Sequence, residues 1–571
     1  MRWSAKPLDF SKAKLGSHER KLGSMSEETE RSPMTTRWSL TTRFVILAAI
    51  WIVATTVHLV LHNMFQDDRT NQIMMFYIVP PTAVFWTLVW WVVLAPFSWK
   101  TRLITLFVGF ATTGAAIAGA LQYYKFEGFW GDFRPRFSRR GDSSAEEEFL
   151  AARKKQEARQ TDTADNEPAT EVEPLTVQNG DCPQFRGTGR DGVYESVTMP
   201  REWNGKQPKE LWRRKVGPAW SSFAVVDGHI FTQMQIGEDE CVVCYDLETG
   251  NELWVHRDEG VRFSEPRAGT GPMATPTFAD NRLYTLGATG ILNCLDPHTG
   301  EEFWQTDILK DAGVDNLEWG MTGSPLVFDG KVVVNPGSDG KNPTSLTAYD
   351  AETGKKLWSD GLRGASYSAP ILATIDGVRQ ILIFDAYGLA GHDAESGKRL
   401  WEFEWSNQPE VNVAMPILRD DGAILLSTGY GVGSALIRVK QTDGKWSAAK
   451  TDWEDSTRFK LKFGDAVQDG NTVYGLNETI LAGFDMEKGK LLWRKRGGFG
   501  FGQVLLADGV IVVLSEQGEV TFVDVNESKQ PVLLKFQAID GKTWGHPVVV
   551  PGKLLVRNAG EMACFDISEV P

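Results

Sequence analysis

The residues with the most recognisable chemical spacing are two cysteines, Cys241 and Cys244, in the sequence CVVC. A C-x-x-C pair can exchange thiols for a disulfide or supply two zinc ligands. The surrounding sequence is typical of a strand, on which residues i and i+3 point to opposite faces and cannot share one metal or form one disulfide. We therefore interpret both as small core side chains and expect no metal-binding residues.

The other cysteines and the histidines give no stronger pattern. Five cysteines, an odd number with no shared spacing, form a poor disulfide framework; they are Cys182, Cys241, Cys244, Cys294 and Cys564. Between residues 181 and 571 there is no G-x-S-x-G, H-E-x-x-H, P-loop or kinase signature. The histidines there are dispersed. The sequence thus assigns no catalytic residue and leaves enzyme activity open.

The element that would position any site is a repeat of the form D-x-x-x-G-x-x-x-W. Its Asp can accept hydrogen bonds from a turn, its Gly allows the positive φ of a tight hairpin, and its Trp can pack between sheets. The copies comprise Asp246, Gly250 and Trp254; Asp296, Gly300 and Trp304; Asp350, Gly354 and Trp358; Asp393, Gly397 and Trp401; and Asp485, Gly489 and Trp493.

The spacing of these repeats predicts propeller blades. Trp212, Trp254, Trp304, Trp358 and Trp401 are separated by 42, 50, 54 and 43 residues, a period typical of four-stranded blades. Counting inner strands predicts an all-β, eight-bladed propeller with four antiparallel strands per blade. The last copy ends at CFDISEVP without its Trp strand. We expect Glu210 to Val216 to supply that strand and close the ring, which protects the sheet edges.

These repeats resemble the PQQ-like propeller repeats shared by quinoprotein dehydrogenases and the outer-membrane assembly lipoprotein BamB. The resemblance extends from about Cys182 to Pro571. The segment CPQFRGTGRDGVY, at its start, is similar to the PQFRG-x-x-RDG segment of many bacterial proteins of this class. The resemblance implies a propeller fold, whereas it says little about activity because one fold hosts many functions.

The resemblance also implies where a cofactor would lie. Quinoprotein dehydrogenases hold pyrroloquinoline quinone (PQQ) at the propeller axis, on a Trp floor and beside a calcium ion. In this sequence the residues that enter the inner strands include Trp220, Tyr367, Lys462 and Trp544, which are our candidate cofactor-binding residues at the axial rim. Trp220 and Trp544 should be neighbours, because blade eight adjoins blade one. Packing between blades is the alternative interpretation of these side chains.

The calcium ligands that such a cofactor needs are less evident. No carboxylate occupies the positions that enter the inner strands, and Asn316, Glu318 and Asn412 are the nearest candidates for calcium-binding oxygens. The adjacent cysteines found in many quinoprotein dehydrogenases are missing from this sequence. We therefore expect no cofactor, with PQQ and calcium as the alternative.

Charge argues against nucleic acid as a partner. The formal net charge is −14, and no basic run occurs in the predicted propeller. Phosphate binding requires a basic face.

Three apolar runs near the N-terminus predict membrane helices. Residues 1–43 are polar and basic, which predicts a cytoplasmic tail. The runs from Phe44 to Leu61, Ile73 to Phe97 and Leu103 to Tyr124 are each about long enough to cross a bilayer, and none is followed by a signal cleavage site. The sequence thus predicts a three-helix membrane segment over residues 44–124.

The cations in the short loops predict the topology. The loop from His62 to Gln72 holds Arg69 beside two aspartates, whereas Ser98 to Arg102 holds two cations, so the tail and the second loop should be cytoplasmic. Three helices then export the propeller. Four arginines between Arg134 and Arg140 favour the opposite orientation, but long domains cross largely regardless of charge, and the resembled family works in the periplasm.

A charged linker joins the helices to the propeller. We expect residues 125–180 to be largely disordered, apart from a short exposed helix from Glu146 to Gln160, and to let the propeller of residues 181–571 stand off the membrane. Thr161 to Asn179 is the most acidic and proline-containing part, and it predicts a flexible tether.

These features together predict a multi-pass protein of the bacterial inner membrane with its propeller in the periplasm. The expected function is a protein-binding scaffold, with a role in envelope or outer-membrane protein assembly as one form of it. The expected partners are the lipid bilayer and an envelope protein. The alternative is a PQQ-dependent alcohol dehydrogenase.

Overall fold

The computed structural model describes residues 38–65, 69–160, 173–419, 421–455, 459–527 and 529–568. The predicted cytoplasmic tail up to residue 37 and the tether over residues 161–172 lie outside the described residues. The first three helices are α1 (Leu40–Met64), α2 (Arg69–Val93) and α3 (Trp99–Tyr123). Each is long and apolar enough to cross a membrane. Ser39 and Ser98 begin α1 and α3 by accepting the backbone N–H of Thr42 and Thr101.

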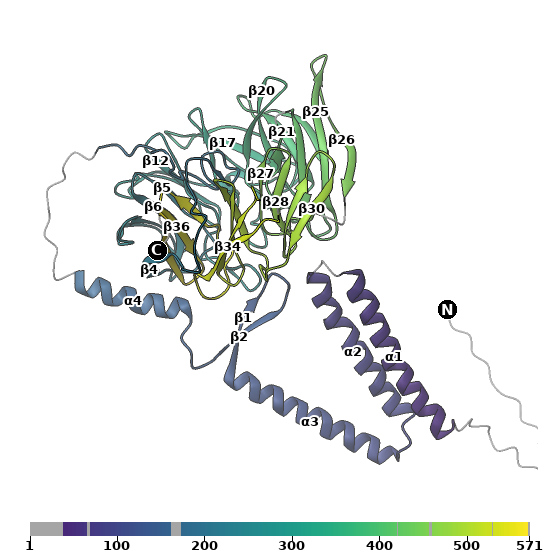
Figure 1. Cartoon of the computed structure of the whole chain (residues 1–571). Coiled ribbons are helices and arrows are strands. Elements are labelled where there is room, and N and C mark those ends of the chain that lie inside the picture. The colour runs from purple at the N-terminus through teal and green to yellow at the C-terminus, as the bar shows by residue number, and fades with distance from the viewer. Residues whose placement is uncertain are drawn as a thin grey trace, which may run out of the picture.

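The rest of the described chain is dominated by an eight-bladed β-propeller, which confirms the predicted fold (Figure 1). Every blade has four antiparallel strands from the inside outward. The strands are β5 (Ala224–Val226), β6 (His229–Ile236), β7 (Asp239–Asp246) and β8 (Glu252–Asp258); β11 (Thr277–Ala279), β12 (Arg282–Leu286), β13 (Ile291–Leu295) and β14 (Glu302–Asp307); β15 (Leu326–Phe328), β16 (Lys331–Val334), β17 (Leu346–Asp350) and β18 (Lys356–Asp360); and β19 (Ile371–Ile375), β20 (Val378–Phe384), β21 (Gly388–Asp393) and β22 (Arg399–Glu404).

The second half of the ring has the same construction. Its strands are β23 (Ile417–Leu418), β24 (Ala423–Thr428), β25 (Gly433–Thr442) and β26 (Lys445–Asp455); β27 (Ala466–Asp469), β28 (Thr472–Asn477), β29 (Ile480–Asp485) and β30 (Lys490–Lys495); β31 (Gln503–Ala507), β32 (Val510–Leu514), β33 (Glu519–Asp524) and β34 (Val532–Gln537); and β35 (Val548–Val550), β36 (Lys553–Arg557), β37 (Glu561–Asp566) and β4 (Lys209–Lys215). The short strand β3 (Val193–Tyr194) adds to β31 in parallel.

A tryptophan joins one blade to the turn of the next at five of the eight junctions. In the third blade, Asp350 accepts the N–H and the hydroxyl of Thr353 at 2.8 and 2.6 Å, and Gly354 has φ +69°. The ring of Trp304, from the preceding blade, lies on Gly354, and its Nε1 donates to the Ala351 carbonyl at 3.1 Å. A tryptophan also lies on the turn glycine of the following blade in four other pairs: Trp212 and Gly250, Trp254 and Gly300, Trp358 and Gly397, and Trp453 and Gly489.

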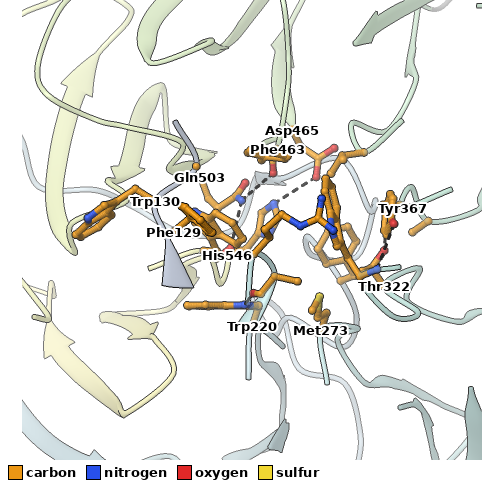
Figure 2. A pocket seen from close by; sticks show the side chains of 18 of the residues that line it. Phe129, Trp130, Trp220, Met273, Thr322, Tyr367, Phe463, Asp465, Gln503 and His546 are labelled. Atoms are coloured by element: carbon orange, nitrogen blue, oxygen red, sulfur yellow. Dashed lines mark hydrogen bonds and ion pairs between the residues drawn. The ribbon is translucent and has the colours of Figure 1, made fainter. Parts of the chain in front are cut away.

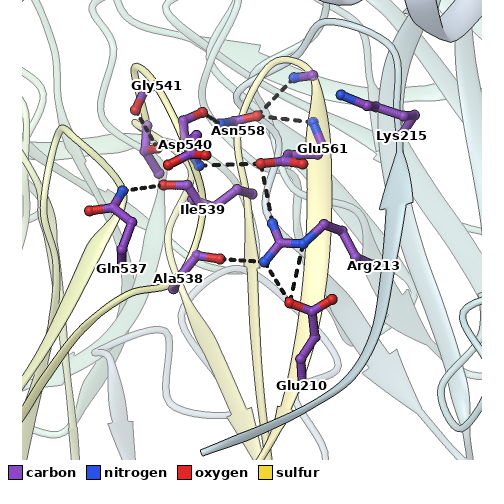
Figure 3. A network of polar contacts seen from close by, with 12 residues as sticks. Glu210, Arg213, Lys215, Gln537, Ala538, Ile539, Asp540, Gly541, Asn558 and Glu561 are labelled. Carbon is purple, nitrogen blue, oxygen red and sulfur yellow. Dashed lines mark hydrogen bonds and ion pairs between the residues drawn. The ribbon is translucent and has the colours of Figure 1, made fainter. Parts of the chain in front are cut away.

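The ring closes as predicted, through a strand that lies before the four strands of the first blade in the sequence. Strand β4 is the outer strand of the final blade and pairs with β37. Figure 3 shows the polar network beside this pairing, in which Arg213 bridges Glu210 at 2.8 Å and Glu561 at 3.2 Å. Arg213 also donates to the carbonyl of Ala538 in the adjacent blade at 2.8 Å.

The segment between the three apolar helices and the propeller contains more regular structure than the predicted, largely disordered linker. It contains the hairpin of β1 (Tyr124–Phe129) and β2 (Pro135–Arg139), followed by α4 (Ala145–Gln160). The hairpin follows α3 directly and points into the propeller (Figure 1). Helix α4 was predicted, but it is docked rather than exposed, because Phe149 is buried and Arg153 pairs with Glu252 at 2.7 Å. The aromatic residues of the hairpin supply apolar area that a disordered linker lacks.

The remaining elements are short. They are the hairpin of β9 (Ser264–Glu265) and β10 (Gly269–Thr270) and the one-turn helix α5 (Ile308–Ala312). The core consists of apolar clusters between adjacent blades, and the largest joins the last two blades to the first.

Candidate functional site

The side chains that precede the innermost strands converge at the propeller axis and enclose a cavity of about 150 Å³ (Figure 2). Its walls are mainly aromatic. The rings of Trp220 and Trp544, the expected neighbours, have centroids 5.5 Å apart, and Phe463 lies 5.5 Å from Trp544. On the opposite wall Trp319 stacks on Tyr367 at 5.1 Å. The cavity is therefore suited to apolar and aromatic groups.

Three of the four predicted rim residues, Trp220, Tyr367 and Trp544, line this cavity. Lys462 does not line it, whereas the next residue, Phe463, does. The Lys462 ammonium lies 4.9 Å from the centroids of Tyr430, Phe463 and Phe501, outside the wall, and donates to Thr70 at 2.8 Å. The chain alternates faces as it enters the strand, so that a shift of one residue exchanges an inward for an outward side chain.

The β1–β2 hairpin closes one end of the axis. Phe129, Trp130, Gly131 and Phe133 line the cavity. The N–H of Gly131 donates to Oε1 of Glu516 at 2.6 Å, and Nε1 of Trp544 donates to the same oxygen at 3.1 Å. A Cβ at Gly131 would overlap the Phe501 ring, so the contact requires glycine. Glu516 is 1% exposed, and its carboxylate is thus committed to the hairpin and the cavity wall.

Residues 182–194, which we call the lead segment, close the other end. Phe185 lines the cavity and meets His546 edge to face at 4.9 Å. Arg186 donates to the carbonyl of Ala466, and Arg190 donates to the carbonyls of Ser324 and Pro325 at 2.9 and 3.0 Å. Both arginines are buried, and they satisfy backbone acceptors around the innermost strands.

The ionised groups at the cavity are already paired. Asp465 lies 3.5 Å from Arg186 and 3.3 Å from Nε2 of His546, and it accepts the N–H of Met415 at 2.7 Å. Burial acts to raise the pKa of Asp465, but Arg186 and His546 together hold it below its ordinary value. Burial lowers the pKa of His546. Asp465 therefore remains a carboxylate that serves the lead segment.

A buried lysine lies behind the tryptophan wall. The Nζ of Lys542 is 3.4 Å from the Trp544 ring centroid and 5.3 Å from that of Trp220, and it donates to the carbonyl of Arg267 at 3.3 Å. Burial lowers the pKa of Lys542 to about 7, while Glu516 acts in the opposite direction. Near neutral pH the charged and neutral forms of this side chain are thus both populated.

The residues present do not fit PQQ with calcium. Glu318 pairs with Arg267, Asn316 donates to the carbonyl of Ala288, and Asn412 is buried and donates to the carbonyl of Asp385. No group of three His, Cys, Asp or Glu side chains that could hold a metal occurs among the residues the structure describes. The cavity is also smaller than the roughly 300–1,000 Å³ of ordinary ligand sites.

The cysteines are all buried and unpaired. On β7, Cys241 lies opposite Met234 and Cys244 lies opposite Phe231. Burial raises the pKa of the Cys241 thiol to about 12 and that of Cys244 further still. Both thiols therefore stay protonated and unreactive at neutral pH.

Three features of the site were missed at the sequence level: the hairpin tip, Glu516 and Lys542. The signal for the tip was the run FEGFWGDFRPRF, in which aromatic residues alternate with glycines and charges. Glu516 and Lys542 lie in loops of the last two blades, where no repeat fixes their position. Only the folded ring brings them to the axis.

The chain contains an eight-bladed β-propeller, and comparisons with known proteins show what it is similar to. Residues 238–456 match the family model described as outer membrane protein assembly factor BamB. The chain is 27% identical over 220 residues to BamB of Burkholderia pseudomallei, which covers 36% of this chain and 52% of that protein. It is 30% identical over 136 residues to quinohemoprotein alcohol dehydrogenase ADH-IIG of Pseudomonas putida, which covers 24% of this chain and 18% of that protein.

Among solved structures, BamB from Moraxella catarrhalis is similar with a TM-score of 0.44 and 16% identity, covering 63% of this chain and 98% of that one. The resemblance to PQQ-like propeller proteins is confirmed by the family model and the sequence matches. The chain spans about half of the length of the matched Burkholderia BamB and less than a fifth of the matched dehydrogenase.

Proposed function

We propose that the protein is a membrane-anchored scaffold whose propeller lies in the periplasm and binds a protein partner of the cell envelope. The observation that carries this proposal is the filling of the propeller axis by the chain's own segments. The hairpin and the lead segment occupy the two ends, where a quinoprotein dehydrogenase would need an open site for cofactor and substrate. The BamB match supports an assembly role within this proposal.

The outer strands offer surface for such a partner. The residue before the blade tryptophan is apolar and exposed in several blades; these residues are Leu253, Phe303, Leu357 and Leu492. They recur because the strand alternates faces, with the tryptophan turned inward and its neighbour outward. Apolar side chains repeated around the rim are available for protein contacts.

The experiment measures the effect of the protein on outer-membrane assembly and, separately, its alcohol oxidation with added PQQ. Removing the protein from its host should lower the content of folded β-barrel proteins in the outer membrane, and the wild-type chain should restore it. A chain carrying Leu253→Glu and Leu357→Glu should restore less. The proposal fails if outer-membrane content is unchanged, or if PQQ and calcium at micromolar concentration give a bound chromophore and dye-linked alcohol oxidation.

A further inference from the structure

The tip of the hairpin is buried at the propeller axis, whereas much of its stem is exposed. Three cavities border the hairpin: about 590 Å³ beside Asp132, Arg134 and the start of α2, about 400 Å³ beside Glu127, Arg136 and α4, and about 260 Å³ beside Phe133. The stem side chains Phe126 and Phe137 are about half exposed, whereas Asp132 at the tip is 2% exposed. The hairpin therefore resembles a ligand inserted in a site more than a packed part of the ring.

We propose that the axial cavity is a binding site for an aromatic β-turn of a partner protein, and that the chain's own hairpin tip fills this site in cis. The proposal rests on the proposed scaffold function and specifies its partner. The ligand class is a turn in which a glycine lies between aromatic residues.

The contacts of the tip define this chemistry. Glu516 accepts the N–H of Gly131, and a carboxylate acceptor strengthens such a hydrogen bond. Phe501 lies so close to Gly131 that only glycine fits at the centre of the turn. Phe129 and Phe133, on either side, line the cavity with the propeller's own aromatic rings. Backbone capture and aromatic pockets together recognise a turn by its shape and its rings rather than by its charge.

The membrane helices hold the hairpin in place. Asp132 pairs with Arg134 at 2.7 Å and with Arg69 at the start of α2 at 3.4 Å, and the Tyr77 hydroxyl donates to the Phe133 carbonyl at 3.1 Å. Because the hairpin is joined to α3, its effective concentration at the site is of about millimolar order. A partner turn must compete with this tip, so a turn of low affinity does not enter the site. Withdrawal of the tip would remove this competition and open the site.

The test measures binding of a labelled synthetic peptide with the sequence of residues 124–139 to the full chain in lipid nanodiscs, by fluorescence anisotropy. Gly131→Val should expel the cis tip, because its side chain meets Phe501 and Glu516. The matched control is Gly141→Val, just beyond the hairpin, where no atom lies within 4 Å of a Cβ. We expect the Gly131→Val chain to bind the peptide at least about tenfold more tightly than the wild type or the control.

Two further variants keep the test decisive if Gly131→Val perturbs the fold. A peptide carrying Gly131→Val should not bind the Gly131→Val chain. Glu516→Gln in that chain should weaken binding of the native peptide about tenfold, because it removes a charge-assisted hydrogen bond. Equal binding by all chains, or by both peptides, overturns the proposal. Failure here leaves the outer-membrane assay of the scaffold function unaffected.

Discussion

Trp212 lies directly opposite Cys564 as its antiparallel strand partner, so that a residue from the start of the propeller completes its last blade. The same tryptophan donates its Nε1 to the carbonyl of Leu247 at 2.9 Å and covers Gly250 in the first blade. One side chain thus joins the last blade to the first. The backbone of Trp212 pairs with the last blade, and its side chain packs against the first blade.

This relationship predicts that the propeller requires β4 but not the segments before the lead segment. Deleting residues 1–180 should leave a soluble, cooperatively unfolding propeller, because the lost residues add no strand to a blade. Deleting residues 1–216 should expose the edge of β37 and cause aggregation. Size-exclusion chromatography and urea unfolding of both proteins check this. Equal solubility and stability would mean that another strand closes the ring.

The interblade packing predicts a difference between two glycines of one blade. Gly354→Ala and Gly330→Ala both place a Cβ at positive φ, +69° and +68°. At Gly354 the Cβ would lie 2.6 Å from Cδ2 of Trp304, whereas no atom lies within 4 Å at Gly330. We expect the Gly330 variant to lose about 1–2 kcal/mol of unfolding free energy.

The Gly354 variant should lose a further 1–3 kcal/mol or so through overpacking against Trp304. Urea unfolding followed by tryptophan fluorescence measures both values. Equal losses would show that the tryptophan moves aside without cost.

Much of the fold could be predicted because its determinants are local and repeated. Each repeat carries its own turn glycine, capping aspartate and tryptophan, and strands of alternating pattern follow one another with short turns. Ring closure could also be predicted, since only Glu210 to Val216 lacked a blade. The hairpin could not, because its stability comes from contacts with Phe501 and Glu516, which are far away in the sequence.

The site was predicted in part for the same reason. Trp220 and Trp544 stand at repeated positions, so that their convergence follows from the ring. Lys462 was predicted in place of its neighbour Phe463 because this blade, like the first and the seventh, lacks the proline that marks the start of the inner strand in the other five. The hairpin and the lead segment close the cavity. Both lie outside the repeats, so the repeat pattern does not predict their contacts.

The buried Lys542 predicts how stability depends on pH. Its folded pKa of about 7 lies below its ordinary value of 10.5, so that between these values the unfolded chain binds a proton that the folded chain does not. Folding must therefore release this proton, which costs nothing above pH 10.5 and costs more as pH falls towards 7. The unfolding free energy should rise by about 1 kcal/mol per pH unit between pH 7.5 and 9.5 from this group.

Lys542→Met should remove this rise. The control is Lys535→Met, whose side chain is 44% exposed and pairs with Glu519 at the surface. Urea unfolding at several pH values compares the slopes of the three proteins. If the wild type and Lys542→Met have parallel slopes, Lys542 is charged in the folded state throughout this range.

The last prediction concerns membrane topology. A reporter enzyme that is active only in the periplasm should be active when fused after Pro571 or after Phe65, and inactive after Lys100. Cations in the second loop favour this orientation. The contacts of α2 instead require the reporters after Phe65 and Pro571 to agree in either orientation: Thr70 accepts from Lys462 of the propeller at 2.8 Å, and Arg69 pairs with Asp132 of the hairpin. The start of α2 and the propeller must therefore lie on the same side of a bilayer.

The arginines after α3 would favour the opposite orientation if they were free to remain in the cytoplasm. In the folded chain Arg134 pairs with Asp132, Arg136 lies 5.3 Å from the ring centroid of Trp130, and Arg140 donates to the carbonyl of Leu121 at 2.7 Å. These contacts give the arginines a structural role on the side of the propeller. An active reporter after Lys100 together with an inactive one after Pro571 would contradict export. Replacing the arginines with glutamine should then restore it.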